Sequence, residues 1–132
     1  MKDNQIQQDR IFFEVRDYEC DMQGIVNNSV YLNYLEHCRH QFIKARGLDF
    51  AEITNQGIYL VLIKAEIDYL KSLRSGDTFY IDTQIERVSK LKLNFIQNVH
   101  KSDNDQLILS AKMTVTSTTK AGLPIVDHLV AS

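Results

Sequence analysis

The stretch NNSVYLNYLEHCRHQFIKARG, residues 27–47, decides the fold, because it is the one long amphipathic helix that the chain predicts. Its apolar side chains recur at steps of three and four, which places them on one helical face. They are Tyr31, Tyr34, Leu35, Cys38, Phe42 and Ala45. Asn27, Asn28 and Ser29 are good amino-terminal caps, and Gly47 supplies a stop. A helix is therefore expected from about residue 29 to residue 46.

Strands are predicted both before and after this helix in the sequence. Residues 10–16 (RIFFEVR) are rich in aromatic and branched side chains, which favours a first strand. After the helix, apolar and polar side chains alternate in four segments that begin near Val61, Phe79, Leu91 and Leu107. Polar turns at 73–77 and 102–105 separate them, and such short connections make the strands antiparallel. We expect the first of these four strands to be half-buried and each of the four to span ten or more residues.

The lengths of these elements limit the architecture. A helix of about 17 residues is roughly 25 Å long. It is the only predicted element that can cover the apolar face of a sheet made from such long strands. We therefore predict an α+β domain in which a long, curved antiparallel sheet wraps around one central helix. No repeat or linker interrupts the chain, so residues 1–132 are expected to form a single domain.

Composition narrows the classes of function. The net charge is −2 and basic residues are scattered along the chain, so the basic patch of a nucleic-acid-binding protein is missing. The two cysteines, Cys20 and Cys38, form no disulfide framework and are expected to be reduced. The amino terminus is polar, and no apolar run approaches the roughly 18 residues of a membrane span. A cytoplasmic protein without membrane or nucleic-acid partners is expected.

The segment VRDYECDMQGIVNNSVYLNYLEHCR, residues 15–39, resembles the hotdog-fold thioesterases of the 4-hydroxybenzoyl-CoA and long-chain acyl-CoA thioesterase branch. In that family an Asp precedes a short Gly-containing loop, a Val-Asn-Asn step and a helix with Tyr, Glu and Arg. The matching residues here are Asp21, Gly24, Val26, Asn27, Asn28, Tyr31, Leu32, Glu36 and Arg39. Ile25 stands where many relatives have His. The resemblance implies a hotdog fold, a thioester hydrolase, and a homodimer or homotetramer with a subunit contact near the site.

Thioester chemistry can be assigned to these residues. A thiol has a pKa near 8.5, so its thiolate leaves without strong protonation. The site must supply an oxygen nucleophile and stabilise an oxyanion, and helix-end amides serve the second task. Asp21 is predicted to act as general base on water or as the nucleophile, two roles that sequence leaves open. The expected substrate and oxyanion contacts are Gly24, Ile25, Val26, Asn27, Asn28 and Ser29. Tyr31 and Glu36 are expected to support them.

Other interpretations compete with this one. Asp21 is also suited to capping its own loop, and Ser89, Lys90 and Lys92 either contact the phosphates of coenzyme A or form a solvated hairpin end. The spacing of the histidines matches no metal motif, so neither a metal nor a cofactor is expected. The preferred prediction is an enzyme that hydrolyses acyl-CoA, or the thioester of an acyl carrier protein. The rivals are a hotdog hydratase or dehydratase and a non-catalytic acyl-binding protein.

Overall fold

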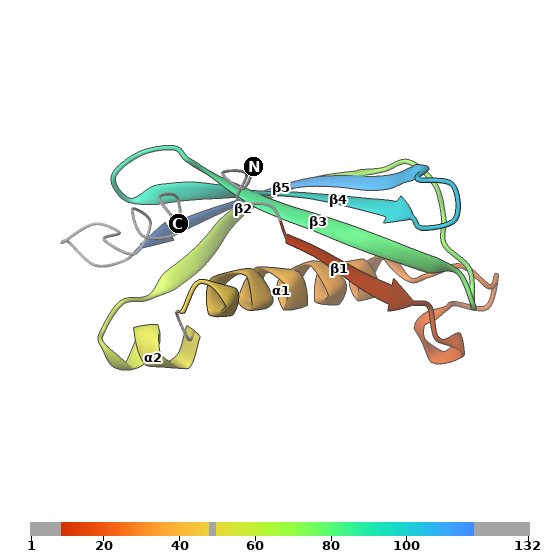
Figure 1. Ribbon diagram of the computed structural model, residues 1–132, viewed down its shortest axis with the longest axis horizontal. Coiled ribbons are helices and arrows are strands. Elements are labelled where there is room, and N and C mark those ends of the chain that lie inside the picture. Colours follow the sequence, from red (N-terminus) through yellow and green to blue (C-terminus); the bar gives the residue numbers. More distant parts are fainter. Residues whose placement is uncertain (1–8, 48–49, 118–132) are drawn as a thin grey trace, which may run out of the picture.

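Residues 9–47 and 50–117 are described by a computed structural model, in which five antiparallel strands form one sheet. The strands are β1 (Asp9–Glu14), β2 (Leu60–Tyr69), β3 (Thr78–Arg87), β4 (Lys92–Lys101) and β5 (Leu107–Ser117), in the order β1-β3-β4-β5-β2. The helices are η2 (Asp17–Glu19), α1 (Asn28–Ala45) and α2 (Phe50–Asn55). The long helix α1 lies along one face of the sheet, which confirms the predicted layout (Figure 1). No helix in the described ranges is long and apolar enough to cross a bilayer.

The ends of α1 follow the local sequence. Asn27 is the amino-terminal cap, and its side-chain oxygen accepts a hydrogen bond from the Ser29 amide at 3.1 Å. At the other end, Gly47 has a φ of +81°, a conformation that a residue without Cβ adopts readily. The helix begins at Asn28 and ends at Ala45, one residue earlier at each end than the predicted range of about 29 to 46. Ala45, expected on the apolar face, is exposed at this end.

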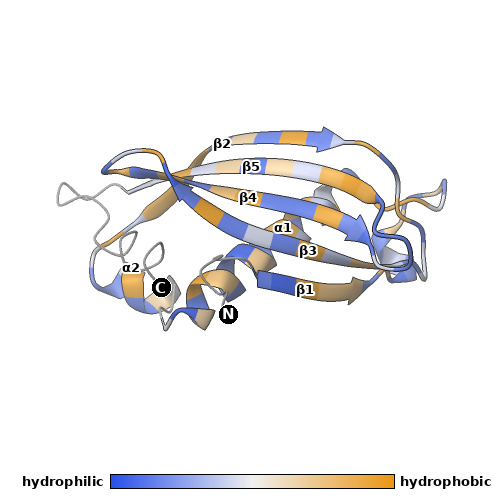
Figure 2. Cartoon of the chain, turned by 45° about the horizontal axis from the view of Figure 1, so that its top comes forward, coloured by the Kyte–Doolittle hydropathy of each residue, from blue (hydrophilic) through white to orange (hydrophobic). Residues whose placement is uncertain are grey.

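The core lies between α1 and the facing side of the sheet. Most residues of β3 and β4 predicted to face inward are buried, among them Phe79, Ile81, Phe95 and Val99, and Figure 2 shows apolar and polar residues mixed along these strands. Burial does not simply alternate, because residues 79–83 of β3 and 93–95 of β4 are buried without interruption. Aromatic rings make two of the contacts, with ring centroids 4.9 Å apart for Tyr34 and Phe79 and 6.0 Å apart for Phe42 and Phe95. The polar side chains of Gln97 and Thr83 are also fully buried in this layer, where Gln97 donates to the Thr83 hydroxyl at 3.2 Å.

The prediction that β2 is half-buried is wrong. Val61, Leu62 and Ile63 are 42%, 45% and 48% exposed, and only Leu60 and Ile67 in this strand are partly buried. The reason is the position of the strand. β2 is at the edge of the sheet, where it pairs with β5 alone, and α1 packs mainly against β3. An exposed edge with apolar side chains on it is prone to pairing with another chain.

The segment predicted as a turn at 73–77 connects two strands that are not neighbours. β2 is at one edge of the sheet, whereas β3 lies between β1 and β4. The connection therefore passes across the end of the sheet, beside the amino end of α1. Leu73 anchors it there, because this side chain is fully buried and its backbone amide donates to the hydroxyl of Tyr31 at 3.2 Å. The short helix α2 also lies in a segment that was predicted to be a plain connection.

Candidate active site

Residues 20–26 form a tight hairpin immediately before α1. Cys20 and Val26 pair in an isolated bridge, and the Asp21 amide donates to the carbonyl of Ile25 at 2.9 Å. The Gly24 amide closes the turn by donating to the carbonyl of Asp21 at 3.0 Å. Gly24 has a φ of +80°, which matches a three-residue hairpin loop that needs glycine after its turn. The predicted spacing from Asp21 to Gly24 is therefore a requirement of this hairpin.

The hairpin is fixed to the connection between β2 and β3. Ile25 pairs with Arg74 in a second isolated bridge, and the Val26 amide donates to the carbonyl of Leu73 at 2.9 Å. Tyr31 holds the same connection from the first turn of α1 and is 3% exposed. Burial raises the pKa of its hydroxyl. Tyr31 thus belongs to the core, where it supports the hairpin indirectly.

The carboxylate of Asp21 is exposed, and its two oxygens have different surroundings. Its Oδ1 accepts hydrogen bonds from the amides of Gln23 at 2.9 Å and Ile25 at 3.4 Å, so Asp21 does cap its own loop. Its Oδ2 accepts no hydrogen bond from any residue that the structure describes. The side chain also makes no hydrogen bond to the amides of α1 within those residues. One carboxylate oxygen is therefore fixed by the hairpin while the other faces solvent.

Residues 24–29 were predicted to contact the substrate and the oxyanion, and most of their backbone amides donate hydrogen bonds within the protein. The amides of Asn27 and Ser29 donate to the carbonyl of Glu19 at 3.1 Å and to the side chain of Asn27 at 3.1 Å. Those that donate within the protein are Gly24, Ile25, Val26, Asn27 and Ser29. Among these six positions in the described part of the chain, only Asn28 has an amide without an acceptor.

The remaining predicted site residues lie elsewhere. Glu36 is exposed two turns farther along α1, where it lines a hollow of about 180 Å³ beside β2. Ser89, Lys90 and Lys92 are at the turn between β3 and β4. This turn is at the opposite end of the sheet from the hairpin (Figure 1), one strand of ten residues or about 30 Å away. A single chain does not bring these three residues to Asp21.

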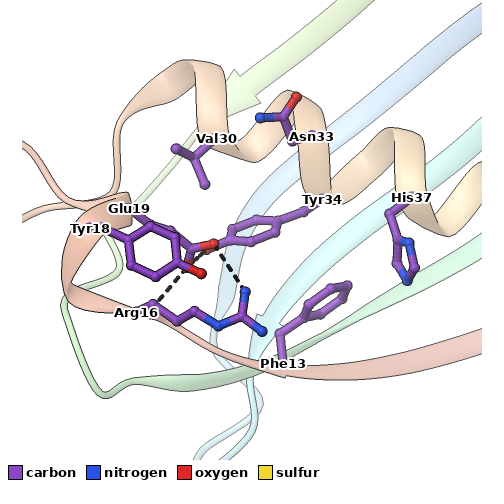
Figure 3. A pocket seen from close by; sticks show the side chains of 8 residues that line it. All are labelled: Phe13, Arg16, Tyr18, Glu19, Val30, Asn33, Tyr34 and His37. Atoms are coloured by element: carbon purple, nitrogen blue, oxygen red, sulfur yellow. Dashed lines mark hydrogen bonds and ion pairs between the residues drawn. The ribbon is translucent and has the colours of Figure 1, made fainter.

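A cavity of about 450 Å³ lies on the other flank of α1, between this helix, β1 and η2. Its walls are Phe13, Arg16, Tyr18, Glu19, Val30, Asn33, Tyr34 and His37 (Figure 3). Glu19 is only 9% exposed. Its Oε1 accepts hydrogen bonds from the Tyr34 hydroxyl at 2.6 Å and from the Arg16 amide at 2.9 Å, while its Oε2 lies 3.7 Å from the Arg16 guanidinium. Burial, and then the hydrogen bond to Glu19, raise the pKa of Tyr34.

Sequence reasoning missed Glu19. This residue falls in a stretch with no hydrophobic period, so nothing local predicts that its carboxylate is buried. The one available signal is its position two residues before Asp21. An acidic residue so close to the candidate base is a reasonable search target in related sequences.

Comparison with known proteins places this geometry in a fold and then in a family. The crystal structure of Slr0204, a 1,4-dihydroxy-2-naphthoyl-CoA thioesterase from Synechocystis, superposes with a TM-score of 0.87 at 18% identity, over 95% of this chain and 96% of that one. A hypothetical protein from Aquifex aeolicus gives a TM-score of 0.83 at 27% identity, over 91% and 98%. The fold is the predicted hotdog fold.

Residues 15–125 match the thioesterase-like superfamily, and the chain belongs to this family. The acyl-acyl carrier protein thioesterase ATL2, chloroplastic, of Arabidopsis thaliana is 40% identical over 104 residues. These residues are 79% of this chain and 55% of that protein, so the chain spans about half the length of this relative.

Proposed function

We propose that this protein hydrolyses acyl thioesters at the junction between the 20–26 hairpin and α1. The observation that carries the proposal is that two polar groups at this junction make no hydrogen bond to any residue that the structure describes. One is the exposed Oδ2 of Asp21, and the other is the amide of Asn28 at the amino end of α1. A carboxylate oxygen supplies a base or nucleophile, and a helix-end amide supplies an oxyanion donor.

The reaction follows from these two roles. As general base, Asp21 takes a proton from water, and the oxygen of that water attacks the thioester carbonyl. As nucleophile, Asp21 attacks the carbonyl itself and forms an anhydride, which water then opens. In both routes the Asn28 amide donates to the oxyanion, the helix dipole favours the negative charge, and the intermediate expels the thiolate. The products are a free acid and a thiol.

The substrate class is argued from the relatives. ATL2 is named for thioesters of acyl carrier protein, whereas Slr0204 is named for a CoA thioester. Both kinds of substrate present the same reacting group, an acyl carbonyl bonded to sulfur. We therefore propose an acyl thioester carried on CoA or acyl carrier protein as the substrate, with the acyl group to be determined by assay.

We further propose that the functional unit is at least a homodimer formed through β2. The exposed apolar residues of this edge strand, among them Val61 and Ile63, favour pairing with a second copy. Antiparallel pairing of β2 with β2 would bring the β3–β4 turn of one protomer to the hairpin end of its partner. Ser89 and Lys90 could then contact a substrate held by the other subunit, which a single chain does not allow.

A panel assay tests the proposed activity against its rivals. Purified protein is incubated with saturated and unsaturated acyl-CoA compounds and with acyl-loaded carrier protein, and released thiol is measured. We expect thiol release from at least one of these substrates. Loss of the double bond without thiol release would indicate a hydratase, and saturable binding without turnover would indicate an acyl-binding protein. Either of those results would contradict the proposal.

Subunit assembly is tested separately by sedimentation. The Ile63→Lys variant places a charge on the exposed edge, and we expect it to shift the protein toward monomer and to lower thioesterase activity. A wild-type protein that sediments as a monomer at assay concentration would refute the proposed dimer.

A further inference from the structure

We propose that Glu19 and Tyr34 are positioning residues that fix the Asp21 hairpin against α1. The inference rests on the proposed function, because it acts through the Asp21 carboxylate. Glu19 is two residues before Asp21, and its side chain bridges the exit of β1 and the second turn of α1. Neither residue is proposed to touch the substrate.

Glu19 connects the exit of β1 with two places on α1, its second turn and its amino-terminal cap. Its Oε1 accepts from the Arg16 amide at 2.9 Å and from the Tyr34 hydroxyl at 2.6 Å. Its backbone carbonyl accepts from the amide of Asn27, the cap of α1, at 3.1 Å. The residue therefore ties the start of the hairpin to the helix whose first amide, that of Asn28, is the proposed oxyanion donor.

Tyr34 provides a rigid anchor for this connection. The ring is 6% exposed, and its centroid lies 4.9 Å from that of Phe79 and 5.2 Å from that of Phe13. Core packing thus determines where the hydroxyl lies, independently of Glu19. A short hydrogen bond from a fixed hydroxyl to a carboxylate then determines where Glu19 lies.

The tip of the hairpin has few other restraints, whereas its end next to α1 is held to the β2–β3 connection through Ile25 and Val26. Asp21, Met22 and Gln23 are exposed, and within residues 20–26 only Val26 is buried in the core. Packing therefore contributes little at the tip. Polar contacts are the larger restraint there, and catalysis is sensitive to this restraint, because displacement of a reacting group by about 1 Å can lower the rate by about 100-fold. A buried carboxylate is costly to the fold unless it is fully paired, which argues for a specific role at this position.

Two conservative variants test the inference. Tyr34→Phe keeps the ring packing and deletes the hydroxyl, and Glu19→Gln keeps the volume and removes the charge. We expect kcat for thiol release to fall between about 10-fold and 100-fold in each variant, with KM within about twofold of wild type. Tyr80→Phe is the matched control, because its hydroxyl also donates to a carboxylate, that of Asp105 at 2.7 Å, on the outer face of the sheet. This control should keep wild-type kcat.

A double-mutant cycle separates positioning from general loosening of the fold. We expect Asp21→Asn/Tyr34→Phe to be no slower than Asp21→Asn alone, since a positioning residue has nothing left to position. A smaller folded fraction would lower the residual rate of the double variant as well. An equal fall in both backgrounds, or wild-type kcat in Tyr34→Phe, would overturn the inference. If Asp21→Asn kept full activity, the proposed role of Asp21 would be overturned, and the positioning role of Glu19 and Tyr34 with it. If Asp21→Asn were inactive and Tyr34→Phe kept normal kcat, only the positioning role would be overturned.

Discussion

Replacing Gly24 with alanine perturbs the hairpin without creating a clash. A Cβ at this position would meet only the Arg74 Nη1 atom, at 3.8 Å, which is an ordinary contact. The cost therefore comes from the backbone, because φ is +80° and an alanine in a left-handed conformation costs about 1–2 kcal/mol. For a domain of this size we expect the midpoint of thermal unfolding to fall by roughly 3–10 °C.

The same substitution should also lower activity. In Gly24→Ala the backbone relaxes from its strained φ, and this shifts the turn. The turn is closed by the hydrogen bond from the Gly24 amide to the Asp21 carbonyl, so Asp21 moves with it. We expect kcat for thiol release to fall at least about tenfold. Gly57→Ala is the matched control, since Gly57 has a φ of +84°, has open space around it and follows α2, far along the chain from the hairpin.

Circular dichroism during heating and thiol release from one acyl-CoA substrate measure the two effects. We expect both variants to lose similar stability, while only Gly24→Ala loses kcat. Two outcomes would refute the reasoning, namely unchanged kcat in a destabilised Gly24→Ala protein, or equal losses of kcat in both variants. Gly24→Asn should recover part of both properties, because asparagine tolerates a positive φ better than alanine.

Three further predictions concern the core. Gln97→Leu should lower the free energy of unfolding in urea by about 1–3 kcal/mol, because it removes the hydrogen bonds of Gln97 to Leu35 and Thr83 and takes away the side-chain acceptor of the Arg39 guanidinium. In native protein at pH 8, a thiol reagent should modify Cys20 and spare the buried Cys38 until denaturant is added; rapid modification of both would contradict this burial. Burial also raises the pKa of the Cys38 thiol to about 12, above its unfolded value near 8.5, so the folded state keeps a proton that the unfolded state loses. The free energy of unfolding should therefore fall as pH rises from about 8.5 toward 12, and Cys38→Ala should show a shallower fall in urea titrations at several pH values.

Periodicity predicted the parts of this fold that local geometry determines. Most of the apolar face of α1 and most inward-facing residues of β3 and β4 were found correctly, because side chains on a helix or strand repeat with a fixed period. Ala45 and Leu91, at the ends of these patterns, are exposed. The segment that carries Asp21 was predicted as a loop that leads into the helix, since Gly24 and the cap at Asn27 are local requirements of a turn and a helix end, but its hairpin pairing was not predicted.

The remaining features depend on contacts between distant parts of the chain. Nothing local to residues 70–77 indicates that β2 and β3 lie apart in the sheet, because strand order is a property of long-range pairing. The exposure of Val61 has the same origin, since it reflects the edge position of its strand. The burial of Glu19 depends on Tyr34, fifteen residues later, and the amide of Val26 donates to the distant carbonyl of Leu73.

The most direct test of the account compares kcat/KM for Asp21→Asn with that for Asp103→Asn, whose aspartate is exposed in the turn between β4 and β5. Both changes remove one carboxylate charge and keep the side-chain size. We predict that Asp21→Asn loses at least about 100-fold, the scale expected for removal of a positioned acid or base, while Asp103→Asn is unaffected. An Asp21→Asn protein that hydrolyses the same thioester within about twofold of wild type would contradict the account.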